Sequence, residues 1–427
     1  MIATHNRRDV LAHTLDQLPR AGLPQHEYET IVVDNASRED VAGVVARHAN
    51  AVLVRLRRNR GSCAKAFGVD RARGDYILFL DDDSFPRPWM LPRMIARFAA
   101  DARLGAAGFT VHLPDGAQEC SALPHVFVGC GVGFRTAALR GVGGLDRSLF
   151  MAAEEYDVSF RLLRAGWRVE VFGDLHVDHL KSPQARRRER ITELDVRNNL
   201  WLVDRYLPEP YRSVYARDWE ERYGWLAERA GHSAAFARGR RAGRRGAAWR
   251  RRTWAGQRLD DASLEAVFAW RRVEAAMRRL YDGGVRCVVL ADASKNLYTF
   301  YRGARMAGLR VLAIADDALA APGRRYRRVP VAATDDALAR GPDAIVVSNT
   351  SYVHAARRVA ALGARTALPV HSWFPAPATT SSADPTSGRH PVLAALPPAT
   401  SSPAGAGVSA RCEAVGRRGL VEFPVHK

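Results

Sequence analysis

Short apolar runs alternate with helix-forming patterns through residues 1–210, and this alternation limits the possible folds more than any other feature. Residues 30–33, 52–56 and 76–80 are strand-sized and largely apolar, whereas residues 10–18 and 91–98 carry apolar side chains at helical spacing. Strands of a parallel sheet are buried on both faces and therefore read as short continuous apolar runs. The pattern predicts βα units and an α/β fold.

The first strand of this series is expected to be shortened. Only Met1, Ile2 and Ala3 precede a polar loop that begins at Thr4. A strand of that length makes few sheet hydrogen bonds and buries little apolar area.

Residues 263–375 repeat the alternation and predict a second, smaller Rossmann-like α/β domain. Its expected strands are 287–290, 311–315 and 344–347, and its expected helices are 297–307 and 352–362. The loop after its first strand, residues 291–296, lacks the GxGxxG pattern of dinucleotide-binding loops. The pattern favours a non-catalytic accessory role, while binding of another small ligand or of a protein stays open.

Two further segments complete the predicted organisation. Residues 211–262 are rich in arginine and predict a basic helical connector. Residues 376–427 are rich in Pro, Ala and Ser and predict a disordered tail, because such a segment buries too little apolar area to offset the entropy of ordering.

The cysteines and the hydropathy indicate a cytoplasmic protein. No apolar stretch approaches the ~20 residues of a membrane span, and the first residues do not resemble a secretory signal. No CxxC pair is present, which argues against a zinc site and a disulfide framework. The five scattered cysteines are Cys63, Cys120, Cys130, Cys287 and Cys412.

The net charge of +19 indicates an affinity for anions such as phosphate-rich substrates, anionic lipid or nucleic acid. Part of this charge lies in an arginine cluster that runs from Arg238 to Arg252. The cluster is consistent with docking on an anionic membrane surface, which would make the protein peripheral on the inner face of the cell membrane. It is also consistent with a solvated linker. Nucleic acid is disfavoured, because no reading motif accompanies the arginines.

A run of three aspartates, Asp81, Asp82 and Asp83, ends the apolar run 76–80. Neighbouring carboxylates raise one another's pKa, so such a group favours a bound cation. Oxygen ligands suit Mg²⁺ or Mn²⁺, and open α/β sheets bind ligands at the carboxyl ends of their strands. A solvated acidic turn is the simpler alternative.

Two later clusters also carry candidate groups. Glu154, Glu155 and Asp157 open a helical pattern, where carboxylates are favoured by the helix dipole and where one of them can act as a general base. His176 and His179 fall on opposite faces of a predicted strand, so either one can complete a metal site or be a structural histidine.

Polar loops follow the other predicted strands at the same edge of the sheet. Asp34 can accept a hydrogen bond from a base or a ribose, and Arg7 can pair with phosphate. Gly61 permits a close approach of the backbone to a ligand. Each of these loops taken alone is an ordinary turn.

Taken together, residues 1–210 resemble the family 2 glycosyltransferases, which have the GT-A fold, a Rossmann-like fold for nucleotide-diphospho-sugar transferases. The pieces occur in the family's order, and Arg197-Asn198 resembles a downstream segment of bacterial members that build cell-surface glycans. The subset that uses rhamnosyl or galactofuranosyl donors is the most similar. The matching pieces are Thr4-His5-Asn6-Arg7, Val33-Asp34-Asn35-Ala36-Ser37, Asn59-Arg60-Gly61, Leu80-Asp81-Asp82-Asp83, Gly129-Cys130-Gly131, Gly143-Gly144-Leu145-Asp146 and Glu154-Glu155-Tyr156-Asp157.

The resemblance implies a role for each candidate residue. Asp81, Asp83 and His179 would hold Mg²⁺ or Mn²⁺. Glu155 falls on the position of the general base, where aspartate is usual, and Glu154 and Asp157 flank it as further catalytic candidates. The residues implied in nucleotide-sugar binding are Thr4, Asn6, Arg7, Asp34, Asn59, Gly61 and Asp82.

The implied function is inverting, metal-dependent transfer of a sugar from a nucleotide-sugar to a glycan or lipid-linked acceptor, in cell-surface polysaccharide synthesis. One alternative is a nucleotidyltransferase that makes nucleotide-sugars, although such enzymes usually carry a Gly-rich loop at the first strand. The other alternative is a catalytically dead GT-A scaffold. A glycosidase is disfavoured, because it needs two carboxylates and no nucleotide-sized loops.

Overall fold

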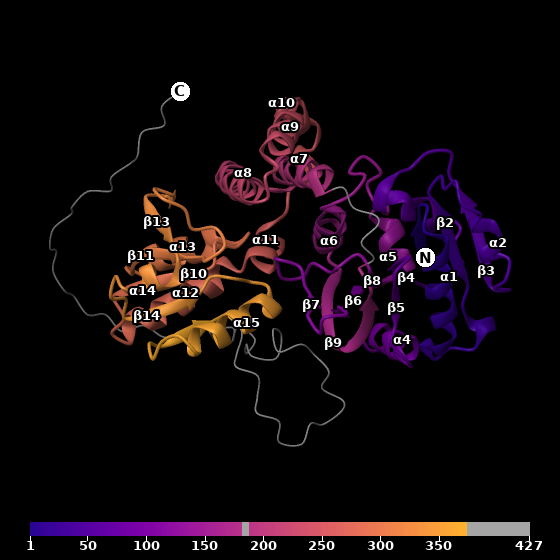
Figure 1. Cartoon of the computed structure of the whole chain (residues 1–427), viewed down its shortest axis with the longest axis horizontal. Helices are drawn as coiled ribbons and strands as arrows, with labels where there is room; N and C mark the ends of the chain where they lie inside the picture. Colours follow the sequence, from indigo (N-terminus) through magenta and orange to yellow (C-terminus); the bar gives the residue numbers. More distant parts are fainter. Residues whose placement is uncertain (182–187, 374–427) are drawn as a thin grey trace, which may run out of the picture. The chain divides into compact units, whose positions relative to one another are not determined.

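The computed structural model describes residues 1–181 and 188–373 (Figure 1). The disordered tail predicted for residues 376–427 lies outside the described residues, as does Cys412. No helix in the described ranges is both long and apolar enough to cross a bilayer.

Residues 1–181 build a mixed sheet with helices on it. The strand order is β3-β2-β1-β4-β8-β6-β9-β5, with β7 beside β6. The strands are β1 (Ile2–Thr4), β2 (Thr30–Asp34), β3 (Ala51–Arg55), β4 (Tyr76–Asp81), β5 (Ser84–Pro86), β6 (Leu104–His112), β7 (Gln118–Glu119), β8 (Gly131–Arg135) and β9 (Arg168–His179). The helices are α1 (Arg8–Gln17), α2 (Val41–Val45), α3 (Ala66–Val69), α4 (Met90–Ala100), α5 (Thr136–Gly141) and α6 (Glu154–Arg164), with short 3₁₀ turns η1 (Leu18–Ala21), η2 (Gln25–Glu27) and η3 (Gly61–Lys65).

The expected α/β class is confirmed, and the strand pairing refines it. Strands β3, β2, β1 and β4 are parallel, as their apolar runs predict. Beyond β4 the sheet changes direction, because β8 pairs antiparallel with both β4 and β6. The wholly parallel sheet expected from the sequence is therefore limited to four strands. The βα pattern carries no information on the direction of strands joined by longer loops.

The shortened first strand is present as three residues. Ile2 pairs with Val32 of β2 on one side and with Leu80 of β4 on the other. Its side chain is fully buried in the core formed with α1, α2 and α4. Because β1 lies between β2 and β4 in the sheet, its Ile2 side chain is buried even though the strand is only three residues long.

Helices fill residues 188–282, in agreement with the expected helical connector. Arg250 is buried, although it lies in the most basic part of this segment, because it pairs with Asp204 at 3.0 Å. The elements are α7 (Arg188–Tyr206), α8 (Tyr211–Arg229), α9 (Ser233–Arg244), α10 (Ala247–Thr253), η5 (Ala255–Gln257), α11 (Asp261–Phe268) and α12 (Trp270–Asp282).

The second sheet has the strand order β12-β13-β11-β10-β14-β15, and all its neighbours are parallel except β12 and β13. The elements of this region are β10 (Cys287–Ala291), α13 (Leu297–Met306), β11 (Arg310–Ala315), β12 (Arg325–Tyr326), β13 (Val329–Ala332), α14 (Thr334–Leu338), β14 (Ala344–Val347), α15 (Tyr352–Gly363) and β15 (Val370–Ser372). The three strands and two helices expected from the sequence correspond to β10, β11, β14, α13 and α15, while β12, β13, α14 and β15 were not predicted. The exact domain boundaries stay a prediction.

Candidate functional site

The register of the first sheet places three of the predicted loops at one edge. Thr4 is level with Asp34 of β2, and Ala3 is level with Asp81 of β4. Because these strands are parallel, the residues that follow them leave the sheet on the same side. The structure therefore brings together the Thr4–Arg7 loop, the loop after Asp34 and the triple aspartate.

Arg7 and Thr4 hold the second and third aspartates. The Arg7 guanidinium bridges Asp82 and Asp83, at 2.7 Å from an oxygen of each. The Thr4 hydroxyl donates to the other Asp82 oxygen at 2.7 Å. The second and third aspartates are accordingly buried and held by ion pairs and a hydrogen bond, so the triple aspartate is not a solvated turn.

Lys65 holds the first aspartate, and no sequence motif had singled it out. Its Nζ donates to Asp81 Oδ1 at 2.7 Å and to the Gly129 carbonyl at 2.9 Å. The lysine is buried although it lies in a short 3₁₀ turn whose pattern resembles any surface loop. A lysine buried in this way needs a carboxylate partner, and only the tertiary structure shows which one.

His179 lies beside the same cluster at the end of β9. Its Nε2 is 3.4 Å from Asp83 Oδ1 and has no hydrogen-bond partner within the described ranges, while Nδ1 is 2.7 Å from Glu119 on β7. The predicted alternation along the strand is confirmed, because His176 faces elsewhere and contacts His112 at 3.1 Å. Of the two histidines, the structure brings only His179 to the aspartates.

The electrostatics of the cluster are strongly coupled. Burial raises the pKa of Asp82 to about 7 despite Arg7 and Thr4. Burial also opposes ionisation of Asp83, but His179 and Arg7 hold its pKa well below the usual range. Burial alone would lower the pKa of His179, yet its polar contacts with Asp83, Cys130 and Glu119 raise it to about 12. Three carboxylates are thus matched by cations from Arg7, Lys65 and His179.

The ligand types here fit a divalent cation. Asp81, Cys130 and His179 offer atoms that all lie within 4.8 Å of one another, and Asp83 adds a carboxylate next to the unpartnered Nε2. Glu119 accepts from Nδ1 and Nε2 is directed at the carboxylates, so a bound metal ion would take the place of the Nε2 proton, as in many metal-bound histidines. Carboxylate and imidazole ligands suit Mn²⁺, and the carboxylates also suit Mg²⁺. Cys130 was not among the ligands expected from the sequence.

The loop after β2 presents a buried acceptor. Asp34 Oδ1 accepts from the Ser37 amide at 2.8 Å, whereas the buried Oδ2 accepts no hydrogen bond from a described residue and lies 3.2 Å from Arg55 Nε. Asn6 caps the neighbouring turn, because its Oδ1 accepts from the Arg38 amide at 2.8 Å. A buried carboxylate oxygen that accepts no hydrogen bond within the protein can accept one from an N–H of a base or an O–H of a ribose.

Asn59 and Gly61 shape the loop after β3. Asn59 Oδ1 accepts from the Gly61 amide at 2.7 Å and from Asn35 at 3.0 Å. Gly61 has φ +64°, and a Cβ there would lie 2.1 Å from the Phe150 carbonyl oxygen. The close approach that this glycine permits is thus to the chain itself, whereas the sequence had suggested an approach to a ligand.

Two of the three acidic candidates on α6 point toward the cluster. Gly129 packs against Glu155, since a Cβ on this glycine would lie 3.1 Å from Glu155 Oε1. Glu154 accepts from Ser62, and its second oxygen is buried without a hydrogen bond. Burial, with the neighbouring Glu154, raises the pKa of Glu155 to about 8.

Asp157 is placed differently from the other two. One of its oxygens accepts from Tyr206 at 2.6 Å and from Arg205 at 3.0 Å, and the other pairs with Arg161. These contacts tie α6 to α7. Both of its carboxylate oxygens are therefore engaged within the protein.

Comparison with known proteins identifies the N-terminal part of the chain. Residues 1–129 match the family model described as "Glycosyl transferase family 2". The poly(ribitol-phosphate) β-N-acetylglucosaminyltransferase TarS of Staphylococcus aureus is 27% identical over 90 residues, which cover 20% of this chain and 16% of TarS. The succinoglycan biosynthesis protein ExoO of Rhizobium meliloti is 33% identical over 121 residues, which cover 27% of this chain and 34% of ExoO.

Solved structures that are similar to this chain include a mannosyltransferase of Pyrobaculum calidifontis in complex with GDP-Man and Mn²⁺. It is 19% identical, with a TM-score of 0.40, over 66% of this chain and 86% of that chain. The part of this chain that matches the family model, residues 1–129, carries Thr4, Arg7, Asp34, Lys65 and the triple aspartate.

Proposed function

We propose that the chain is a glycosyltransferase that moves a sugar from a nucleotide-sugar to a hydroxyl group of a glycan or lipid-linked acceptor. The observation that carries the proposal is the single sheet edge where Asp34, the Arg7–aspartate cluster and Glu155 meet. In this proposal Asp34 binds the nucleotide, the Arg7–aspartate cluster binds the diphosphate, and Glu155 contacts the acceptor hydroxyl. The names of the relatives, which include a hyaluronan synthase and ExoO, support a role in cell-surface polysaccharide synthesis.

The donor is held from the nucleotide end. Asp34 Oδ2, buried and without a hydrogen bond, accepts from the base or the ribose. Thr4 and Asn6 shape the adjoining loop, and Asn59 and Gly61 form its far side through Asn35. Arg7 faces the diphosphate, because it already holds Asp82 and Asp83 at the end of the same strand pair.

Asp81, Asp83 and His179 would hold Mg²⁺ or Mn²⁺ next to the diphosphate. When bound, such an ion neutralises negative charge on the departing nucleoside diphosphate. Lys65 contributes a second, permanent positive charge beside Asp81. Glu119 fixes the imidazole ring of His179 for this role.

Glu155 acts as the general base. It accepts the proton of the acceptor hydroxyl while the hydroxyl oxygen attacks the anomeric carbon, and the bond from that carbon to the diphosphate breaks. A single displacement of this kind inverts the anomeric configuration. Glu154 maintains the negative surroundings that keep Glu155 basic, and Asp157 positions α6 through Arg161, Arg205 and Tyr206.

Release of nucleoside diphosphate from a panel of nucleotide-sugars, with Mg²⁺ or Mn²⁺ and a glycan acceptor, tests the proposal. Acceptor-dependent release from one donor is expected, and NMR of the product should show an inverted anomeric centre. Formation of a nucleotide-sugar from a sugar phosphate and a nucleoside triphosphate would indicate the nucleotidyltransferase alternative. No turnover with any donor, together with intact donor binding, would indicate a catalytically dead scaffold.

A membrane-facing surface of α9 and α10 is part of the proposal, since it would bring the enzyme to a lipid-linked acceptor. Five arginines of the 238–252 segment pair with Glu193, Glu220 or Asp204. Arg241, Arg245 and Arg252 are exposed and have no ion pair with any described residue, and Trp249 beside them is 66% exposed. Free cations around an exposed tryptophan are typical of a surface that docks at an anionic interface.

A further inference from the structure

The second sheet has a ligand-binding position of its own. Strand β10 lies between β11 and β14. The chain therefore adds β11 on one side of β10 and later adds β14 on its other side. Open α/β sheets bind ligands at this switch of strand order, outside the carboxyl ends of the strands. The loops that follow β10, β11 and β14 begin at this edge, because the three strands are parallel.

A cavity of about 390 Å³ occupies this position. Three strand ends contribute to its lining through the loops that follow them, and α8 and α15 supply the remaining walls. The polar residues that matter for its chemistry are Arg222, Asp292, Asn349, His354, Arg357 and Arg358.

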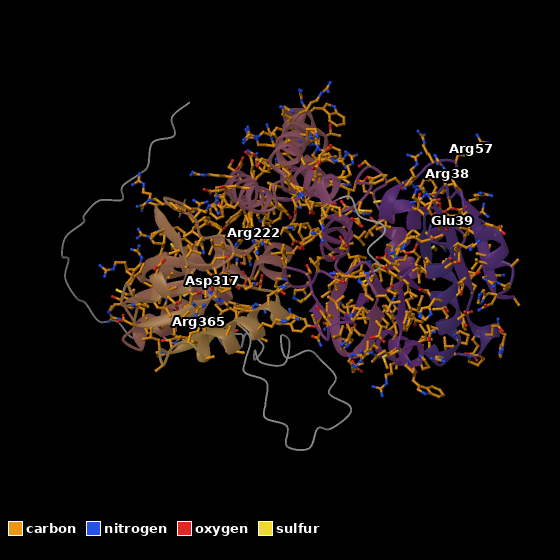
Figure 2. The ribbon with its side chains drawn as sticks, in the orientation of Figure 1. Arg38, Glu39, Arg57, Arg222, Asp317 and Arg365 are labelled. Atoms are coloured by element: carbon orange, nitrogen blue, oxygen red, sulfur yellow. The ribbon has the colours of Figure 1, made fainter. Side chains whose placement is uncertain are left out.

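Two of the arginines in this cavity lack a carboxylate partner. Arg222 comes from α8 and donates through Nε to the Ala293 carbonyl at 2.8 Å (Figure 2). Arg357 is exposed on α15. Neither of the two forms an ion pair with any residue of the described ranges. Two guanidinium groups at one concave site favour an anion that accepts several hydrogen bonds.

The acidic side of the cavity consists of Asp292 and Asp316, and both carboxylates are engaged. Asp316 accepts from the backbone amides of Ala293 at 3.0 Å and Leu319 at 2.9 Å. Asp292 pairs with Arg358 Nε at 3.0 Å and accepts from Asn349 at 3.2 Å. Its φ of +86° is rare for a residue with a side chain, so these contacts hold a strained loop in place. Backbone strain maintained at a strand end is a common feature of ligand sites.

His354 adds a neutral hydrogen-bonding group to the same wall. Burial, with Arg357 and Arg222 nearby, lowers its pKa, so the imidazole is uncharged at neutral pH. Its Nδ1 lies 2.8 Å from Ser351 Oγ at the start of α15. The wall therefore combines permanent cations with a polar ring that does not repel them.

We propose that this cavity binds a small phosphate-bearing molecule, with Arg222 and Arg357 pairing with its phosphate and His354 hydrogen-bonding to it. The loop has no GxGxxG pattern, so the ligand is a mononucleotide, a sugar phosphate or phosphate itself and not a dinucleotide. This site is separate from the sugar-transfer site, and it does not depend on the function proposed above.

Isothermal titration of the full chain with inorganic phosphate, glucose 1-phosphate and UDP, without divalent metal, tests the proposal. Arg357→Glu should weaken one phosphate-binding site about tenfold or more, because it replaces a cation with an anion at an exposed position. Arg305→Glu is the matched control, since Arg305 is exposed on α13, has no ion pair among the described residues and lies outside the cavity.

If Arg357→Ala and Arg357→Glu lower the affinity for all three probes equally, the site recognises the phosphate group alone. If they lower only the affinity for UDP, the site recognises the nucleoside as well as the phosphate. Unchanged binding of all three probes by both Arg357 variants would overturn the proposal. So would an equal loss in Arg305→Glu, because the effect would then be that of net charge. Melting temperatures without ligand show whether each variant is folded.

Discussion

At the scale of single residues, the site consists of charged groups that are buried against one another. Asp82 and Asp83 share Arg7, and Asp81 is bound to Lys65. Removing one member of such a set leaves its partner buried without compensation, which costs more than the pair itself contributes. Residue substitutions at this edge should therefore change stability as well as activity, and the two effects can be separated by pH.

Glu155→Gln should abolish turnover and leave donor binding intact, because a general base typically contributes 10²–10⁴-fold to rate. The raised pKa of Glu155 means that the folded protein holds this proton more tightly than the unfolded chain does. Stability from this group is therefore lost as pH rises from about 4.5 towards 8. The melting temperature of Glu155→Gln, relative to that of the wild type, should rise between pH 5 and pH 9. A variant that keeps substantial activity would refute the assignment of Glu155 as the general base.

Lys65→Met should destabilise the protein at pH 7, because Asp81 would lose its buried cation; breaking a pair of this kind costs about 3–5 kcal/mol. Burial opposes ionisation of Asp81, and Lys65 lowers its pKa, so the stabilisation is present above the unfolded pKa and is lost on acidification. Urea unfolding should show the deficit of pH 7 shrinking once the pH falls below about 3.8, the ordinary pKa of an aspartate. Arg73→Met, at an exposed arginine paired with Glu29, is the control and should change little at either pH. An equal deficit for Lys65→Met at both pH values would contradict the explanation.

At the scale of elements, two strands and two helices bring distant groups to the site or the surface. Strand β9 carries His179 to the triple aspartate through its pairing with β5, where Ser84 is level with His179. Strand β7 brings Glu119 to the same histidine. Helices α9 and α10 divide their arginines between internal ion pairs and an exposed face. The position of each element thus decides what its side chains can do.

Glu119→Gln should weaken Mn²⁺ binding about 10–100-fold, because the carboxylate on β7 orients the metal-facing imidazole. Mn²⁺ affinity measured by electron paramagnetic resonance reports this without any turnover. Asp178→Asn on β9 is a suitable control, since Asp178 pairs with Arg87 and not with His179. Unchanged affinity in Glu119→Gln would show that the imidazole needs no such support.

A combined variant should co-sediment less than the wild type with anionic vesicles at low salt. It carries Trp249→Ala, Arg241→Glu, Arg245→Glu and Arg252→Glu. Exposed cations attract an anionic surface, and salt screens them, so wild-type binding should also fall at high salt. The control changes the same number of charges at Arg305, Arg340 and Arg57, which have no ion pair with any described residue. Equal loss in both variants would mean that net charge, and not this face, determines binding.

At the scale of the whole molecule, hydrogen bonds anchor α8 to the second sheet. Trp219 Nε1 donates to the Lys295 carbonyl at 2.8 Å, and Tyr215 OH donates to Asn296 at 3.0 Å while accepting from Trp270 at 3.0 Å. Both aromatic residues are buried. These hydrogen bonds join the helical segment to the loops that follow β10.

Tyr215→Phe should lower the free energy of unfolding by about 1–3 kcal/mol, because it leaves the buried Trp270 N–H without its acceptor and removes one of the two hydrogen bonds to Asn296 Oδ1. Chemical denaturation measures the loss, and sugar transfer measured on the folded variant should stay near the wild-type rate. Tyr28→Phe is the control, since the Tyr28 hydroxyl makes no hydrogen bond with a described residue. A wild-type stability for Tyr215→Phe would show that α8 is held by apolar packing alone.

The amino-acid sequence by itself determined the α/β class, the parallel strands at the centre of each sheet, and the loops that meet at the first sheet edge. It could do so because apolar periodicity and strand-end polarity are local properties of the chain. Only the tertiary structure decided the mixed direction of the sheet, the choice of His179 over His176, the burial of Lys65 beside Asp81 and the engagement of Asp157 with α7. These depend on contacts between residues far apart in the sequence, where burial and charge compensation, and not local pattern, select the partner.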